Sequence, residues 1–382
     1  MKKLLTIVGA RPQFIKAAAL SRRIREHYPD AVDETIVHTG QHYDHNMSQV
    51  FFEEMGIPEP AVNLEIGSGS HGLQTGKMMI AMEEVMLQEK PDAVVLYGDT
   101  NSTLAGAMVA SKNHLPVFHI EAGLRSFNKT MPEEINRIGC DHVSTLLFSP
   151  TAQGIANLAA EGFRSGSPEP YHIDRPGIFH TGDVMYDNAL FFTSPEMARE
   201  EVLERFGLAP GTYILGTIHR PVNTDQPSRL AAILEALRQV AHDHRQPVVL
   251  PLHPRTRHIM EQRDRQFLDQ LASDPLIRLE EPVSYLEMLT LEQQSSLILT
   301  DSGGVQKEAW FFKKPLLVLR QETEWKEIID SGNGCLVDAD PQAIVKQAAR
   351  YLSHPPTDFP PLYGKGDAAG EILEIILGTQ WS

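Results

Sequence analysis

Short apolar runs rich in β-branched residues alternate with longer amphipathic segments along the whole chain. Strands that are apolar along their entire length and are separated by helices are typical of parallel sheets covered on both faces. The expected strands are residues 4–8, 35–38, 93–97, 116–120, 146–148, 178–180, 213–217, 247–251, 297–300, 315–319 and 334–337. The clearest expected helices are 14–27, 74–89, 229–243 and 341–352. This alternation predicts an α/β protein.

The length of 382 residues indicates two domains, at about 100–200 residues per domain. A turn-rich segment at 164–170 predicts a linker, and a proline-rich segment at 354–361 precedes the last expected helix. We therefore expect a first domain over residues 1–175, completed by the C-terminal helix at 366–382, and a second domain over 176–365. A cleft between the two is expected to hold the ligand.

The charge excludes several classes of partner. There are 34 basic against 50 acidic side chains and a net charge of -16, so nucleic acid and anionic membranes should repel the chain.

The two cysteines, Cys140 and Cys335, are far apart in sequence, which argues against a disulfide framework or a thiolate zinc site and fits a reducing cytoplasm. No apolar stretch approaches the roughly 20 residues that cross a bilayer. We expect a cytoplasmic protein without a membrane segment.

Polar clusters follow the expected strands in both halves of the chain. In open parallel sheets, ligands bind outside the carboxyl ends of the strands, so these clusters should face a common crevice. The loops at the amino ends of the strands lack the same mixture, which disfavours the alternative that all loops are simply polar. The clusters lie at 9–12, 40–42, 98–100, 119–121, 182–183, 218–220, 253–255 and 300–304.

The segment 301–308, with the sequence DSGGVQKE, links an expected strand to a helix. Glycines let a phosphate approach the backbone, and a helix N-terminus offers free N–H groups and the positive end of the helix dipole. Glu308 lies about one turn into this helix and could accept hydrogen bonds from a ribose diol. An ordinary Asp or Ser cap with a tight turn is the alternative interpretation.

Basic and imidazole groups occur beside several of these strand ends. Arg11 and Lys16, in the segment 9–16, are expected to form a positively charged site for an anion. The alternative is that Lys16 is an ordinary solvated residue of the helix. His219 and His253 are expected to serve as phosphate or proton-transfer partners. The spacing of His38, His42 and His45 matches no common zinc pattern, so no metal site is expected.

An acidic set lies in the first half of the chain. Asp99 and Glu121 end neighbouring expected strands, where two carboxylates repel each other unless something binds there. Glu133 and Glu134 begin an expected helix after a proline. The alternative to a catalytic role is that their charges only complement the dipole of this helix. Such sets supply general acids and bases for proton transfer at carbon, with Arg125 and Arg137 available to balance the charge. No motif around Cys140 indicates a catalytic nucleophile, so its side chain is expected to pack in the buried core.

These motifs together resemble the non-hydrolysing UDP-N-acetylglucosamine 2-epimerase family over essentially the whole chain. The matching motifs are GARPQFIK at 9–16, GDTNSTLA at 98–105, HIEAGLR at 119–125, PEEINR at 132–137, HR at 219–220, HP at 253–254 and DSGGVQKE at 301–308. The resemblance implies two Rossmann-like domains in a glycosyltransferase-B arrangement, an active site in the interdomain cleft, UDP bound mainly by the second domain, and a homodimer.

The resemblance also implies roles for single residues. The positions that match the family's catalytic residues are Arg11, Lys16, Asp99, Glu121, Glu133 and His219. Those expected to contact UDP are Arg11, His219, His253, Ser302, Gly303, Gly304 and Glu308, the last as the ribose ligand. Family chemistry inverts C2 of the sugar by eliminating and re-adding UDP through a 2-acetamidoglucal, with no nicotinamide or metal.

Several motifs depart from the commonest family pattern. Many members read TRPE at 10–13, HRxEN at 219–223 and TERPE at 323–327, where this chain has ARPQ, HRPVN and TEWKE. These changes resemble the branch that acts on UDP-2,3-diacetamido-2,3-dideoxyglucuronic acid. The loop 41–47 also differs from the segment that binds an allosteric UDP-GlcNAc in some bacterial members.

Four functions are weighed on these grounds. The leading hypothesis is C2 epimerisation of UDP-GlcNAc to UDP-ManNAc, with the diacetamido uronic acid as an alternative substrate. A glycosyltransferase of the same architecture is the alternative from another reaction class. A hydrolysing 2-epimerase is disfavoured by Pro12 and Lys16, and a catalytically silent sensor is disfavoured by the full acidic set.

Overall fold

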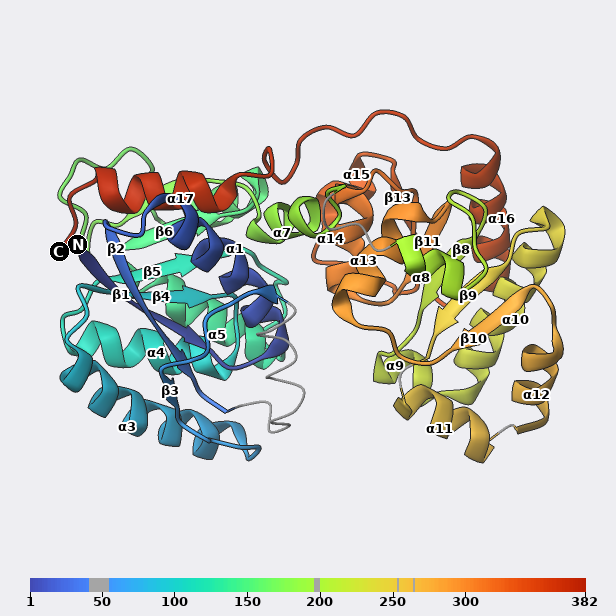
Figure 1. Cartoon of the computed structure of the whole chain (residues 1–382), viewed down its shortest axis with the longest axis horizontal. Coiled ribbons are helices and arrows are strands. Elements are labelled where there is room, and N and C mark those ends of the chain that lie inside the picture. The colour runs from blue at the N-terminus through green and yellow to red at the C-terminus, as the bar shows by residue number, and fades with distance from the viewer. Residues whose placement is uncertain (41–54, 196–199, 253, 264) are drawn as a thin grey trace. The chain divides into compact units, whose positions relative to one another are not determined.

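The computed structural model describes residues 1–40, 55–195, 200–252, 254–263 and 265–382 (Figure 1). The chain forms two compact units, one made of Met1–Asn188 with Pro361–Ser382 and the other of Ala189–Pro360. Each unit is described by itself below. The segment 41–47, which includes His42 and His45, and the position of His253 lie outside the described residues.

Seven parallel strands of the described chain form the sheet of the first unit, in the order β3-β2-β1-β4-β5-β6-β7. This order reverses direction between β1 and β4, as in a doubly wound Rossmann sheet. The strands are β1 (Lys2–Val8), β2 (Val32–His38), β3 (Val62–Asn63), β4 (Ala93–Tyr97), β5 (Val117–Ile120), β6 (Leu146–Ser149) and β7 (Gly177–His180).

Helices cover both faces of this sheet, with α1 and α17 on one side and α3 and α4 on the other (Figure 1). The packing of α4 is close, because a Cβ on Gly106 would come within 2.8 Å of Ile7 and 2.9 Å of Leu96. The helices are α1 (Arg11–His27), α3 (His71–Glu89), α4 (Asn101–Lys112), α5 (Pro132–Asp141), α6 (Ala152–Ala160) and α17 (Ala368–Gly378). Helix α7 (Val184–Phe192) begins in this unit and ends in the second.

The first unit ends later than the boundary expected at residue 175. The turn-rich segment 164–170 leads into β7, which pairs with β6 inside the first sheet, so it is a loop within this unit. The unit continues to Asn188, and the C-terminal segment returns to it from Pro361. Asp187 accepts hydrogen bonds from the N–H groups of Ala368 and Ala369, which fixes the start of α17 on the unit.

Six parallel strands of the described chain form the sheet of the second unit, in the order β10-β9-β8-β11-β12-β13. They are β8 (Ile214–Thr217), β9 (Val248–Pro251), β10 (Ile277–Glu280), β11 (Leu297–Thr300), β12 (Leu316–Val318) and β13 (Gly334–Leu336). The helices are α8 (Glu200–Arg205), α9 (Pro221–Thr224), α10 (Pro227–His244), α11 (Pro254–Arg263), α12 (Arg265–Ser273), α13 (Tyr285–Gln294), α14 (Gly303–Phe311), α15 (Lys326–Asp330) and α16 (Pro341–Ser353).

The predicted fold class, α/β with two Rossmann-like sheets, is confirmed. Two strands, β3 and β10, are not among the predicted ones, and both lie at the edge of a sheet. Of the four residues of β10 only Ile277 is buried, and β3 is two residues long and partly exposed. An edge strand packs on fewer neighbours, so it lacks the continuous apolar run by which the central strands were identified.

Candidate active site

Helix α1 and the end of strand β5 bring a lysine and a glutamate together in the first unit. Lys16, in the second turn of α1, lies 2.7 Å from the carboxylate of Glu121, which follows β5. Both residues are buried, with exposed fractions of 6% and 9%. Gly98 makes room for the pair, because a Cβ there would lie 3.1 Å from the Lys16 ammonium. An ion pair this deeply buried is strengthened by the low dielectric constant around it.

Asp99 joins the same electrostatic cluster from the end of β4. It forms an ion pair with Arg137 of α5. Burial raises the pKa of Asp99, while Arg137 and Lys16 pull it down and the charges of Glu121 and Glu133 raise it further. Glu133 is exposed in the first turn of α5, whereas Glu134 is buried. The charges of Glu121 and Glu133 are therefore close enough to Asp99 to influence its protonation.

Glu121 has an unusual backbone conformation. Its φ angle is +74°, in a region that residues with a side chain rarely adopt. Two hydrogen bonds hold the segment, since the N–H groups of Glu121 and Ala122 both donate to the carbonyl of Phe148. Strained backbone of this kind persists where the surroundings fix it, and it is common at functional sites.

A buried histidine links the two carboxylate-bearing strand ends. His119 is fully buried, with Nδ1 2.7 Å from Asp141 and Nε2 2.7 Å from the carbonyl of Gly98. Because both partners are acceptors, both ring nitrogens must donate, which requires the imidazolium form. Burial opposes this charge, but Cys140 and Asp141 beside the ring outweigh it and raise the pKa of His119 well above its usual value. The ring thus ties the turn before Asp99 to the strand before Glu121.

Gln13 fixes the turn that leads into α1. Its side-chain oxygen accepts hydrogen bonds from the N–H groups of Gly9 and Ala10, and its amide nitrogen donates to the carbonyl of Tyr97 and to Thr103. The turn after β1 is thereby joined to the end of β4. Arg11, which follows this turn, is exposed.

In the second unit, Asp301 organises the loop after β8. Its carboxylate accepts hydrogen bonds from the N–H groups of His219 and Arg220 and from the side chain of Asn223. The Nδ1 atom of His219 also lies 3.1 Å from Asp301, which is fully buried. Burial alone would raise the pKa of Asp301, but the hydrogen bond and charge of His219, with Asn223 and the Arg220 N–H, lower it.

The glycine-rich turn opens α14, a helix of nine residues. Ser302 caps the helix by accepting from the N–H of Val305 at 3.5 Å. The carbonyl of Gly303 accepts a hydrogen bond from the indole of Trp325, and a Cβ on Gly303 would lie 2.6 Å from Oε1 of Glu324, so that side chain would have to move. Glu308 is buried in the second turn, and its Oε2 atom is 4.0 Å from the place of a Cβ on Gly304.

The structure therefore assembles most predicted residues in two groups. The first unit brings Lys16, Asp99 and Glu121 together, with Glu133 at the edge of the group and Arg11 exposed at the start of α1. The second unit gathers a further group around the turn after β11, namely His219, Ser302, Gly303, Gly304 and Glu308. Their catalytic and binding roles remain predictions.

Two residues that hold these groups in place are not among the predicted site residues. The sequence predicts Asp301 only as a possible helix cap, although its carboxylate accepts hydrogen bonds from two backbone N–H groups about 80 residues away. Gln13 was noted only as a departure from the family pattern. In both cases a polar residue directly beside a buried strand end was the available signal.

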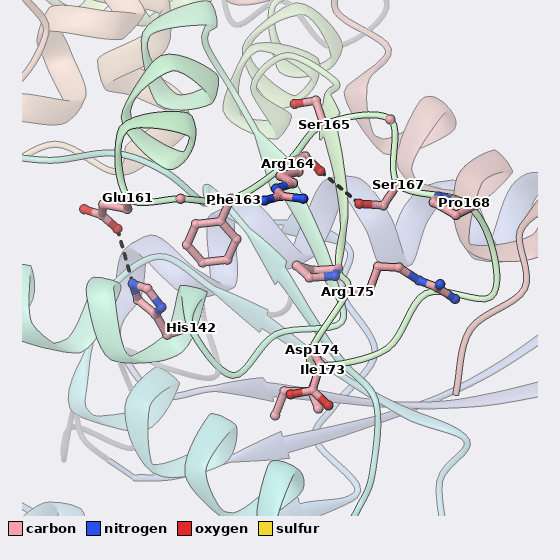
Figure 2. A pocket seen from close by; sticks show the side chains of 13 residues that line it. His142, Glu161, Phe163, Arg164, Ser165, Ser167, Pro168, Ile173, Asp174 and Arg175 are labelled. Atoms are coloured by element: carbon pink, nitrogen blue, oxygen red, sulfur yellow. Dashed lines mark hydrogen bonds and ion pairs between the residues drawn. The ribbon is translucent and has the colours of Figure 1, made fainter.

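A cavity of about 640 Å³ in the first unit contains none of the predicted site residues. It lies between the loops 161–168 and 173–176 (Figure 2). His142 and Glu161 form an ion pair of 3.5 Å at one side of it, and Arg175 approaches from the other loop (Figure 2). Its lining residues are mostly exposed and carry charges of both signs, so they indicate no particular ligand.

Comparison with known proteins assigns the chain to a family. The sequence profile described as UDP-N-acetylglucosamine 2-epimerase matches residues 24–377. The chain belongs to this family. It is 49% identical over 375 residues to the UDP-2,3-diacetamido-2,3-dideoxy-D-glucuronate 2-epimerase of Pseudomonas aeruginosa, covering 98% of this chain and 99% of that protein. The resemblance proposed from the motifs is therefore confirmed, and family members are isomerases.

Solved structures of the family agree with the fold. The UDP-GlcNAc 2-epimerase of Methanocaldococcus jannaschii, crystallised with UDP-GlcNAc and UDP, matches with a TM-score of 0.82 at 40% identity, covering 98% of this chain and 99% of that one. The Neisseria meningitidis enzyme bound to UDP-GlcNAc matches with a TM-score of 0.83 at 29% identity, covering 99% and 100%. Within the described residues, no helix is both long and apolar enough to span a membrane.

Proposed function

We propose that this family member inverts C2 of a UDP-linked N-acetylated hexosamine by eliminating UDP and adding it back. The observation that supports this most strongly is the group formed by the buried pair of Lys16 and Glu121 together with the half-buried Asp99. Carboxylates that share a charge network can exchange protons with carbon at neutral pH, which the inversion of a C–H centre requires. A simple nucleotide-sugar binder would have no need of such a group.

In the proposed reaction, a carboxylate of the first unit takes the proton from C2 while the C1–O bond to UDP breaks. The electron pair of the C–H bond forms the C1–C2 double bond of a 2-acetamidoglucal, and UDP leaves with its negative charge. A proton is then delivered to the opposite face of C2 as the UDP oxygen bonds again to C1. Proton and UDP are both returned, so the reaction needs no nicotinamide and no metal.

We assign UDP binding to the second unit. The turn at Ser302, Gly303 and Gly304 offers close backbone approach and a helix N-terminus to the diphosphate. Glu308, on the same face, would accept hydrogen bonds from the ribose hydroxyls. His219, which Asp301 holds in place, would meet the charge that develops on the departing UDP. Arg11 and His253 complete the set of proposed UDP contacts.

Two sugars are candidates for the substrate. UDP-GlcNAc is the molecule bound in the family structures at 40% and 29% identity. UDP-2,3-diacetamido-2,3-dideoxyglucuronic acid is favoured by the 49% identity to an enzyme named for it. Its extra carboxylate would have to meet an Arg or Lys side chain, for which Arg11 is an exposed candidate.

The test is to incubate the purified chain with each sugar nucleotide and no acceptor, and to follow the C2 epimers by NMR. Conversion of either to a UDP-linked epimer supports the proposal and excludes a glycosyltransferase, which needs an acceptor. Release of a free sugar would instead indicate a hydrolysing 2-epimerase. No conversion of either sugar would contradict the proposal.

We further propose that the chain forms a homodimer. Helix α3 exposes Leu73, Ile80 and Leu87, spaced by seven residues, so they form one apolar stripe. Their exposed fractions are 56%, 67% and 60%, which is unusual for a row of large apolar side chains. A second copy of the same helix would cover the stripe. Ile80→Asp should then halve the mass measured by light scattering, whereas an unchanged mass would contradict this assignment.

A cytoplasmic location is also proposed. Cys140 is buried and free, and Cys335 is free as well. Unpaired cysteines are usual where the surroundings keep thiols reduced. Cell fractionation with an antibody to the chain would test this.

A further inference from the structure

Glu292, near the end of α13, is a fully buried carboxyl group that none of the predicted roles uses. Within the described residues, neither of its carboxyl oxygens accepts a hydrogen bond from a backbone N–H, a hydroxyl, an amide or a cationic side chain. An ionised carboxylate without donors is very costly at such a position, because it loses its hydration and gains nothing in return. The buried Glu292 side chain must therefore be stabilised by something other than hydrogen bonds donated to an ionised carboxylate.

The group beside it is another carboxyl, that of Glu308. Helices α13 and α14 pack together, and Glu308 is the residue whose charge and side chain act on the pKa of Glu292. Glu308 is itself buried, with 4% of its surface exposed. Two carboxyl groups can share a hydrogen bond only if one of them carries a proton.

The proton belongs to Glu292. Burial raises the pKa of Glu292 well above its usual value, and the charge and hydrogen bond of Glu308 raise it further. Glu308 lies nearer the first turn of α14, where its Oε2 atom faces Gly304. The two groups repel each other least when Glu292 is a neutral acid and Glu308, which faces Gly304, is the ionised carboxylate.

We propose that the carboxylic acid of Glu292 is a positioning residue, which donates a hydrogen bond to Glu308 and so fixes the carboxylate that accepts the ribose hydroxyls of UDP. The inference rests on the proposed function, because it deepens the role given there to Glu308. Glu292 touches no ligand. It sets the direction of Glu308 and keeps one of its oxygens occupied, leaving the other for the ribose.

This role predicts selectivity for ribose over 2′-deoxyribose. A site built to bond a hydroxyl rejects an analogue that lacks it, because its own polar group is then left unpaired. If Glu308 lost its support, it would turn or take up a proton, and the preference would fall. Glutamine at position 292 keeps a neutral N–H donor of nearly the same shape, whereas methionine and leucine keep the volume and lose the donor.

The experiment measures the dissociation constants of UDP and 2′-deoxy-UDP by calorimetry for the full chain and for E292Q, E292M and E292L. The unchanged chain and E292Q should prefer UDP by about tenfold or more, as expected for one hydrogen bond to a charged group. E292M and E292L should keep the affinity for 2′-deoxy-UDP and lose most of the preference. Affinity for 2′-deoxy-UDP also reports that each variant is folded, and the two apolar variants guard against one failing to fold.

The possible outcomes separate the two proposals. An undiminished preference in E292M and E292L would overturn the inference, and so would a loss in E292Q equal to theirs. If the unchanged chain bound neither nucleotide, the proposed function itself would be overturned. If it bound both equally, the ribose role of Glu308 would be overturned and the inference with it.

Discussion

The two units hold their key carboxylates by different means. In the first unit, Glu121 and Asp99 are paired with the side-chain cations Lys16 and Arg137. In the second unit, Asp301 is held by backbone N–H groups, by the amide of Asn223 and by the imidazole of His219. A side-chain cation can move with its partner and follow a proton, whereas a backbone N–H is fixed. The first arrangement suits proton transfer, and the second suits the shaping of a binding loop.

The largest expected effect is on turnover in the first unit. Glu121→Gln should reduce turnover by roughly 10²–10⁴-fold, the usual contribution of a general acid or base. The dissociation constant of UDP should change by less than about threefold, because the second unit is proposed to bind it. Both are measured on the same preparation, by NMR and calorimetry. A large loss of UDP affinity with unchanged turnover would reverse the roles given to the two units.

The next effect concerns the stability of the first group. Lys16→Met should lower the free energy of unfolding at pH 7 by about 3–5 kcal/mol, since it leaves Glu121 buried without its partner. The matched control is Arg238→Ala, which removes an exposed ion pair with Glu235 and should cost less than about 1 kcal/mol. Urea unfolding measures both. Equal losses would show that burial does not distinguish the two pairs.

A third expected effect is a pH dependence in the first unit. Burial, with Asp183 and Asp367 nearby, raises the pKa of Asp187 to about 6 despite two backbone N–H donors. A raised carboxyl pKa gives stability that is fully present below the unfolded pKa of about 3.9 and is lost as the pH rises through about 6. Relative to Asp187→Asn, the chain should lose about 2 kcal/mol of unfolding free energy between pH 4 and 7. A difference that does not vary with pH would contradict this.

Asp301 should show a pH dependence of the opposite sign. Its pKa is lowered, so its stability is present above the unfolded pKa of about 3.9 and is lost as the pH falls through the folded value. Asp301→Asn should cost about 2 kcal/mol of unfolding free energy at pH 7, the usual contribution of hydrogen bonds to a charged group. The difference in unfolding free energy between the chain and Asp301→Asn should become smaller as the pH falls. If the difference grew instead, the backbone donors would not be holding an ionised carboxylate.

The central sheets could be predicted from sequence, because a strand buried on both faces must be apolar throughout. The predicted bounds at 93–97 and 297–300 coincide with β4 and β11. The domain boundary could not be predicted, because a turn-rich loop followed by a strand looks the same inside a sheet as between two. Only pairing with β6 assigns β7 to the first unit.

The predicted site residues were found where strands end, but the residues that support them were not. Asp301 receives its donors from the segment 219–220, and such a contact leaves no local pattern. Glu292 lies in the sequence LEQQ, which is typical of an exposed helix face, and only the packing of α13 on α14 buries it. Long-range contacts of polar groups are invisible to periodicity, since one residue of each pair is an ordinary polar residue in its own segment.

The most direct measurement of the central claim is the fate of the hydrogen at C2. The purified chain should be incubated in heavy water with each of the two candidate UDP sugars, and the C2 position followed by NMR and mass spectrometry. Removal and return of the C2 proton by protein carboxylates predicts one deuterium at C2 of the epimer, formed more slowly with Glu121→Gln. Epimerisation with the original hydrogen retained at C2 would contradict it.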